Sequence, residues 1–140
     1  MRIGYTSGVF DLFHIGHLNI LKKAKSKCDY LIVAVTNDDL AYKLKSKKPV
    51  IPFRERFEII KSIKFVDKVV EEKTDDKLSA KKKYKFNIIF KGDDWKNTNK
   101  WKILKKEFNK KNTKVLFLKY TKNTSSTLIK NVCENIYRKK

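Results

Sequence analysis

The chain has 140 residues and a formal net charge of +20 at pH 7, with 41% hydrophobic and 12% aromatic residues. This length suits one domain with one core, and no apolar run approaches the roughly 18 to 20 residues of a membrane helix, which excludes a membrane-spanning protein. The first six residues lack the long apolar stretch of a signal peptide. Two distant cysteines, Cys28 and Cys133, exclude a disulfide framework and a cysteine zinc site, and predict a reducing, cytoplasmic location.

The excess positive charge is carried by lysine, because four of the 35 basic residues are arginines. Such a charge attracts polyanions, so nucleic acid and anionic membranes must be considered. The lysines are scattered over almost every segment, however, and proteins that read base sequence favour arginine. We therefore interpret most of the charge as a solvated surface with the codon bias of an AT-rich genome, and expect no nucleic-acid partner. A polyanion-binding face is the alternative.

Hydrophobic periodicity predicts strands and helices that alternate along the chain. Strands are expected at residues 3–7, 30–35, 66–70, 86–90 and 115–118. Helices are expected from 14 or 16 to 27, at 53–63 and 75–84, and around 101–108 and 128–136, with a lysine-rich loop at 37–52. The alternation predicts a single α/β domain over residues 1–140, built on a doubly wound, parallel, five-stranded sheet flanked by helices.

In sheets of this kind, ligands bind beyond the carboxyl ends of the strands. The loops that follow Ser7, Val35, Phe90 and Leu118 are therefore the places where chemistry-bearing residues are expected. The first of these loops lies at the start of residues 8–17, whose sequence is Gly-Val-Phe-Asp-Leu-Phe-His-Ile-Gly-His.

Both histidines of the chain, His14 and His17, lie in that first segment at the start of a predicted helix. Gly8 lets the backbone approach a ligand, and a helix N-terminus offers free N–H groups to a phosphate. Residues three apart lie on the same face of a helix, so the two rings should point the same way. Gly16, between them, has no side chain to fill the space in front of the rings. Imidazoles there can donate hydrogen bonds as charge develops in a transition state. A zinc site would need a third and a fourth ligand, and the sequence offers none at a suitable spacing. The remaining alternative is that either histidine caps the helix or lies in the core.

The segment at 8–17 resembles the G-x-F-D-x-x-H-x-G-H signature of the cytidylyltransferases, in the nucleotidyltransferase superfamily. Residues 64–69, Lys-Phe-Val-Asp-Lys-Val, are similar to the family segment R-Y-V-D-E-V. Residues 92–95 match the G-D-D-W of the glycerol-3-phosphate cytidylyltransferases, and residues 120–127 occupy the place of R-T-E-G-I-S-T-T. The segments follow the family order over nearly the whole chain, which implies a Rossmann-like fold.

The resemblance implies transfer of CMP from CTP to a small phosphorylated alcohol, with glycerol 3-phosphate favoured, Mg²⁺ as cofactor and a homodimer as the assembly. The implied catalytic residues are His14, His17, Lys45 and Thr127. The implied nucleotide-binding residues are Gly8, Val9, Phe10, Asp11, Gly16, Asp93, Asp94, Thr121, Ser125 and Ser126, and the implied substrate-binding residues are Lys47, Arg56 and Lys64. No protein ligand to the metal is assigned. The product, a CDP-alcohol such as CDP-glycerol, would serve synthesis of a cell-surface polymer.

Several of these assignments leave alternatives open. Asp11 would orient a histidine or lysine, assist magnesium or cap the helix. Lysines 43 and 48 compete with Lys45 and Lys47, and Arg54 competes with Arg56. The two aspartates at 93 and 94 would bind the nucleotide or serve as turn residues, and the serines at 125 and 126 would bind phosphate or cap a helix.

The chain also departs from the family pattern. Tyr120 replaces an arginine, Asn123 a glycine and Thr124 an isoleucine, while Lys64 replaces the arginine of R-Y-V-D. Losing the arginine at 120 removes a bidentate contact that Lys122 replaces in part. These departures leave ethanolamine, choline and ribitol phosphates open as acceptors. Adenylyl transfer and a basic polyanion-binding module are the rival functions.

Overall fold

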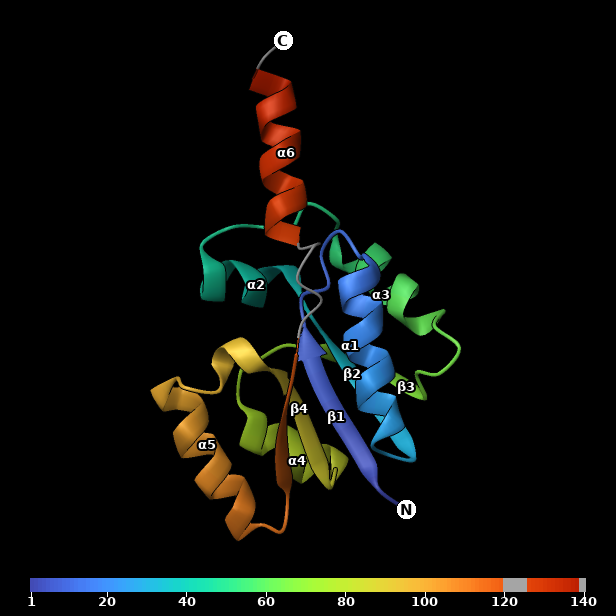
Figure 1. Ribbon diagram of the computed structural model, residues 1–140, viewed down its shortest axis with the longest axis vertical. Coiled ribbons are helices and arrows are strands. Elements are labelled where there is room, and N and C mark those ends of the chain that lie inside the picture. The colour runs from blue at the N-terminus through green and yellow to red at the C-terminus, as the bar shows by residue number, and fades with distance from the viewer. Residues whose placement is uncertain (120–125, 139–140) are drawn as a thin grey trace.

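The computed structural model describes residues 1–119 and 126–138, including the side chains at 1–119 and 129–136. Its described strands form a five-stranded parallel sheet in the order β3-β2-β1-β4-β5 (Figure 1). The strands are β1 (Ile3–Gly8), β2 (Tyr30–Thr36), β3 (Lys68–Glu72), β4 (Ile88–Gly92) and β5 (Lys114–Leu118). The predicted doubly wound, Rossmann-like α/β fold is confirmed.

Helices connect the strands and cover both faces of the sheet. They are α1 (Ile15–Ser26), α2 (Asp38–Lys45), α3 (Phe53–Lys61), α4 (Lys77–Tyr84), the 3₁₀ turn η1 (Asp93–Trp95), α5 (Asn99–Lys110) and α6 (Ser126–Arg138). None of the helices within the described ranges is long and apolar enough to cross a membrane. Figure 1 shows α6 extending away from the carboxyl ends of the strands, where the loops of interest also lie.

Alternate residues of the central strands feed two separate cores, because successive side chains of a strand point to opposite faces. On one face, Val33 and Phe90 pack with Leu21 of α1 and Ile60 of α3. On the other face, the cluster formed by Tyr5, Ile32, Ile89, Trp101 and Phe108 packs beneath α4 and α5. β2 contributes to both faces, which explains its continuous apolar sequence.

Three element predictions need correction, one of them being the strand expected at 86–90, which begins two residues later, at Ile88. The expected loop at 37–52 contains the helix α2, because Asn37 caps it by accepting a hydrogen bond from the Leu40 amide at 2.8 Å, and acidic residues fill its first turn. The strand expected at 66–70 begins two residues later. Asp67 holds the preceding segment instead, since its carboxylate accepts from the Leu31 amide at 2.7 Å and pairs with Lys25.

Candidate active site

A cleft of about 810 Å³ opens at the carboxyl ends of the strands. It extends over both faces of the sheet, with Gly8 of β1 between them. We call the part beside α1 the histidine half, lined by Phe10, Asp11, His17, Lys45, Lys47 and Lys130. We call the part beside α4 and α5 the lysine half, lined by Ser7, Glu72, Asp75, Lys77, Lys91, Trp95, Lys100 and Trp101.

The two histidines form a reciprocal cap at the start of α1. The Nδ1 atom of His14 accepts a hydrogen bond from the Gly16 amide at 3.0 Å, and Nδ1 of His17 accepts from the His14 amide at 3.2 Å. Their rings stack with centroids 4.0 Å apart. Capping and ligand contact were alternatives from sequence, but the geometry allows both, because each cap uses one ring nitrogen.

The protonation of these rings follows from their contacts. An Nδ1 atom that accepts a hydrogen bond carries no proton, so in the neutral ring the proton sits on Nε2. Burial lowers the pKa of His14, and burial together with the charges of His14 and Lys45 lowers the pKa of His17 to about 4, against an opposing effect of Asp11. Both rings are therefore neutral hydrogen-bond donors at pH 7. Within the described part of the chain, the buried Nε2 atom of His14 has no hydrogen-bond partner.

The loop after β1 has an unusual backbone that turns Asp11 inward. Phe10 and Leu12 have φ values of 54° and 51°, in the left-handed region that non-glycine residues rarely adopt. In this conformation the ring of Phe10 packs closely against Gly8, where an added Cβ would lie 3.0 Å from the ring. A side chain at position 8 would therefore require the Phe10 ring to shift by a few tenths of an ångström.

Asp11 connects three segments of the chain. Its carboxylate accepts hydrogen bonds from the amides of Val50 and Ile51 at 2.8 and 2.9 Å, and pairs with the Lys130 ammonium of α6 at 2.8 Å. Burial alone would raise the pKa of Asp11, but Lys130 and the two amides lower it overall. The aspartate therefore positions the walls of the histidine half, a function that the sequence did not single out.

The prediction for Arg56 requires a correction, because its side chain is fully buried and bonds to other groups of the protein. The guanidinium donates to the carbonyls of Val9, Thr36 and Ile51 and to the carboxylate of Asp38 at 2.6 to 2.8 Å. This planar group thus fastens the loops after β1 and β2 to α3. The direct substrate contact predicted for Arg56 has no support in this geometry.

The other predicted basic residues separate into two groups. Lys45, at the end of α2, and Lys47 both line the cleft, as does their competitor Lys48. Lys64 does not, since it lies in the turn before β3, at the amino end of that strand and across the sheet from the cleft. Within one chain, Lys64 therefore lies too far from the cleft to make the predicted substrate contact.

The remaining predicted residues lie at the cleft rim or outside the described residues. Val9 lines the cleft, whereas Gly16 lies buried in the first turn of α1. Asp93 and Asp94 are exposed on η1, next to the cleft-lining Gly92 and Trp95, so their nucleotide contact stays a prediction. Thr121 and Ser125 lie outside the described residues, and so do the side chains of Ser126 and Thr127 at the start of α6.

The lysine half contains a charge network that sequence reasoning missed. Lys77 is 4% exposed and donates to Ser7 Oγ at 2.8 Å and to the carboxylate of Glu72, while pairing with Asp75 at 3.2 Å. Asp75 also pairs with Lys100 of α5. The signal was present in the acidic pair Glu71-Glu72 at the end of the third strand, but the loop after that strand was not among those selected.

No cluster of three or more His, Cys, Asp or Glu side chains that could hold a metal ion occurs among the described residues. What the cleft offers is hydrogen-bond donors and cations. Neutral imidazoles and the lysines at the end of α2 are suited to an anionic ligand that carries several phosphate groups.

The chain matches the family described as cytidylyltransferase-like over residues 5–132. It is 36% identical to a glycerol-3-phosphate cytidylyltransferase from Bacillus spizizenii, over 93% of this chain and 95% of that protein. An FAD synthase from Pyrococcus abyssi is 41% identical over a shorter region, 62% of this chain and 60% of that protein. The fold resembles a lipopolysaccharide core biosynthesis protein from Thermoplasma volcanium with a TM-score of 0.73, 28% identity, and coverage of 89% and 99% of the two chains. The chain belongs to the cytidylyltransferase-like family.

Proposed function

We propose that this protein transfers CMP from CTP to glycerol 3-phosphate and releases pyrophosphate, giving CDP-glycerol, an activated unit for a cell-surface polymer. The observation that carries the proposal is the pair of neutral histidines at the start of α1, each of which accepts a capping hydrogen bond at Nδ1 and carries its proton on Nε2. The nucleotide and the acceptor follow from the name of the relative that the chain matches along nearly its whole length.

In the proposed reaction, a phosphate oxygen of the acceptor attacks the α-phosphorus of CTP in line. A new oxygen–phosphorus bond forms as the bond from the α-phosphorus to the bridging oxygen breaks, and pyrophosphate leaves with the electron pair. The acceptor phosphate is already an anion, so the protein needs no general base. Positioning and charge stabilisation supply the catalysis.

Residues in and next to the histidine half have separate functions in this scheme. His14 and His17 donate from Nε2 to the α-phosphoryl oxygens, more strongly as charge develops on them. Lys45 and Lys47 neutralise phosphate charge at the end of α2. Asp11 and Arg56 hold the surrounding loops in place, so their effect on the reaction is through position.

We propose that Mg²⁺ enters with CTP. The hard cation prefers phosphate oxygens and water, and the described side chains offer no cage of three ligands. The triphosphate would therefore supply most of the coordination, with the protein holding the complex through phosphate contacts. The two free cysteines suit a cytoplasmic reaction, since thiols stay reduced there.

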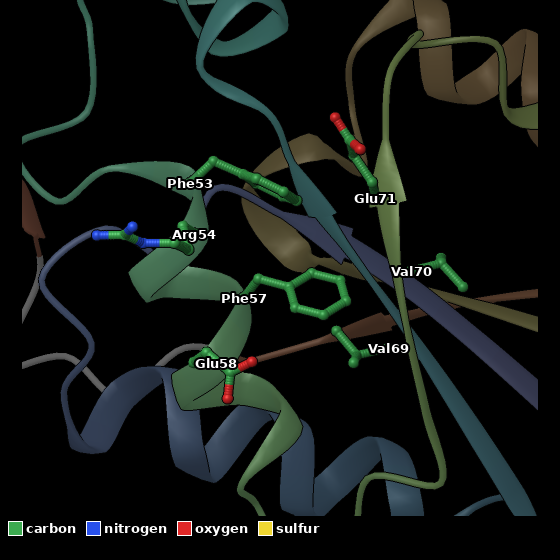
Figure 2. A pocket seen from close by; sticks show the side chains of 7 residues that line it. All are labelled: Phe53, Arg54, Phe57, Glu58, Val69, Val70 and Glu71. Atoms are coloured by element: carbon green, nitrogen blue, oxygen red, sulfur yellow. The ribbon is translucent and has the colours of Figure 1, made fainter.

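A second hollow, of about 460 Å³, lies between α3 and the edge strand β3. Figure 2 shows the rings of Phe53 and Phe57 extending from α3 toward β3. Arg54 and two glutamates, Glu58 and Glu71, flank these apolar groups. We propose that a second copy of the chain covers this surface in a two-fold contact, in which the same patch of each copy meets and the arginine of one copy pairs with a carboxylate of the other.

Light scattering tests this assembly. We expect the wild-type chain to have the mass of two copies and Arg54→Glu to have the mass of one, because the reversal places like charges together. Exposed Arg2→Glu changes the charge equally and serves as the control. A wild-type monomer at micromolar concentration would contradict the homodimer.

Pyrophosphate release tests the reaction. Wild-type protein, CTP and Mg²⁺ are combined with glycerol 3-phosphate or with ethanolamine, choline or ribitol phosphates. We expect release to require CTP and glycerol 3-phosphate, and His17→Ala to lower kcat by roughly 100- to 1,000-fold because a transition-state donor is lost. Lys22→Ala, on the exposed side of α1, is the matched control.

The similarity to an FAD synthase keeps adenylyl transfer as a second candidate. Repeating the assay with ATP, and measuring equilibrium binding of both nucleotides, separates the two. A clear preference for ATP would overturn the cytidylyl proposal. Salt-sensitive binding to DNA that is unchanged in His14→Ala and His17→Ala, without turnover, would instead favour a polyanion-binding module.

A further inference from the structure

Two tryptophans in the lysine half of the cleft surround an ammonium group of the chain itself. The Nζ atom of Lys91, on β4, lies 4.8 Å from the ring centroid of Trp95 and 5.7 Å from that of Trp101. Both distances are within the range of cation–π attraction. All three side chains line the same cleft as His17. Trp95 is exposed at its surface, whereas Trp101 is buried behind the Lys91 ammonium and belongs to the core.

The Lys91 ammonium is an unusual group to bury. Burial, followed by the charge of Lys77, lowers the pKa of Lys91 to about 8, while Glu72, Asp75 and Asp94 act in the opposite direction. Glu72 already bonds Lys77, and Asp75 pairs with Lys77 and Lys100. Glu72 and Asp75 thus have other partners, and the Lys91 ammonium lies against the faces of the two tryptophans.

The position of this cluster relative to the reacting phosphorus matters, and here the argument rests on the proposed function. In the proposed function, the histidines and the lysines at the end of α2 hold the triphosphate in the histidine half. In-line displacement requires the attacking oxygen to approach from the side opposite to the departing pyrophosphate. Across Gly8 from α1 lies the lysine half, beginning at Ser7. The alcohol portion of the acceptor therefore extends toward Lys91.

We infer that Lys91 occupies the aromatic pair of Trp95 and Trp101 with its own ammonium, and thereby excludes acceptors whose alcohol carries a cationic head, such as choline phosphate. Tryptophan faces are the usual binding surface for quaternary ammonium groups. Here that surface is filled, and a second cation would meet like charge at short range in a poorly solvated site. A neutral, hydroxylated head meets no such repulsion and finds donors in Lys100 and an acceptor in Asp75.

Binding of choline chloride, followed by tryptophan fluorescence and calorimetry, tests this inference without turnover. Lys91→Ala frees the two rings, so we expect its Kd for choline to be at least about tenfold lower than that of the wild type. Lys91→Arg keeps a cation over the rings and should show no gain. Lys102→Ala, an exposed lysine of α5, removes one charge away from the rings and should also show no gain.

Thermal melting establishes that each variant is folded. If Lys91→Ala does not fold, Lys91→Met retains the methylene packing without the charge, and we expect a smaller gain in the same direction. In the transfer assay, Lys91→Ala should raise the ratio of kcat/KM for choline phosphate over glycerol 3-phosphate by at least about tenfold.

The outcomes separate the inference from the proposed function. Equal choline affinity in the wild type and in folded Lys91 variants overturns the inference, even if CMP transfer to glycerol 3-phosphate is observed. Absence of transfer to every phospho-alcohol overturns the proposed function, and the choline titration still decides whether Lys91 guards the aromatic pair. Tighter choline binding in Lys91→Ala, with Lys91→Arg and Lys102→Ala unchanged, supports the inference.

Discussion

The two halves of the cleft present opposite electrostatic designs within one continuous space. In the histidine half the key rings are neutral, and each uses its Nδ1 atom to cap the start of α1. In the lysine half the charges are numerous but bond to one another, with Lys77 contacting Ser7, Glu72 and Asp75. The histidine half thus presents neutral hydrogen-bond donors, whereas the lysine half has a fixed pattern of charges that can select among ligands.

The largest expected effect comes from breaking the internal charge balance of the lysine half. Lys77→Met leaves Glu72 buried without its ammonium partner, and we expect a loss of about 3 to 5 kcal/mol in the free energy of unfolding. Urea denaturation measures it. The double variant Lys77→Met with Glu72→Gln should recover part of the loss, because it removes both charges. A single-variant loss below about 1 kcal/mol would mean that water already screens this pair.

The second largest effect concerns the histidine half, and it separates two functions of His14, which are to cap α1 and to donate a hydrogen bond from Nε2. Asparagine is a favourable N-cap, so His14→Asn should retain the cap of α1 but lose the Nε2 donor. We expect near wild-type thermal stability and a roughly 100-fold lower kcat in the transfer assay. His14→Ala, which loses both, should be less stable as well. A His14→Asn enzyme with unchanged kcat would assign His14 to capping alone.

A smaller effect concerns the border between the halves at Gly8. The added Cβ of Gly8→Ala would press on the Phe10 ring, so we expect a kcat/KM about tenfold lower with little change in stability. Gly4→Ala is the matched comparison, since its Cβ would lie 2.6 Å from Phe90 and 2.7 Å from the Cys28 sulfur, in the core. We expect Gly4→Ala to reduce stability by about 1 to 3 kcal/mol. Equal kinetic losses in both variants would show that Gly8 has no special position.

The smallest expected effect is in the pH dependence. The pKa of His17 is lowered to about 4 and that of His14 is lowered as well, so histidine protonation should change kcat less than about twofold between pH 6 and 8. Because the unfolded chain binds these protons more readily, stability should fall as pH drops from 6.5 toward 4. Proton NMR of the imidazoles checks both statements. A histidine that titrates near pH 6.5 would contradict them.

The sequence predicted the sheet and the placement of the histidine loop because both follow from local patterns. Alternating apolar segments predict βαβ units, and the carboxyl ends of parallel strands locate the loops. The helix α2 was missed because its lysine-rich sequence masks a short helix whose start depends on one cap, Asn37. The partner of this cap is the Leu40 amide three residues on, so the start of α2 could have been predicted from Asn37 and the two aspartates that follow it.

Long-range partners account for the rest of the misses. The rarity of arginine correctly suggested that Arg56 provides a fixed planar fork, but its partners are backbone carbonyls from three loops. Lysines are so numerous that Lys77 and Lys91 could not be distinguished from surface residues by sequence. Their burial becomes visible only when the fold brings the end of β3, the end of β4 and the start of α5 around one cleft.

The contacts of Asp11 have a consequence for how the protein acquires its site. They join the beginning of the chain to residues 39 and 40 positions away, and to α6 close to the opposite end. Contacts between distant positions are slow to form, because the intervening chain must first be ordered. During synthesis the sheet can assemble from the N-terminal end, but the Asp11 junction has to wait for the final helix. We expect the capacity to bind nucleotide to be among the last properties that the growing chain gains.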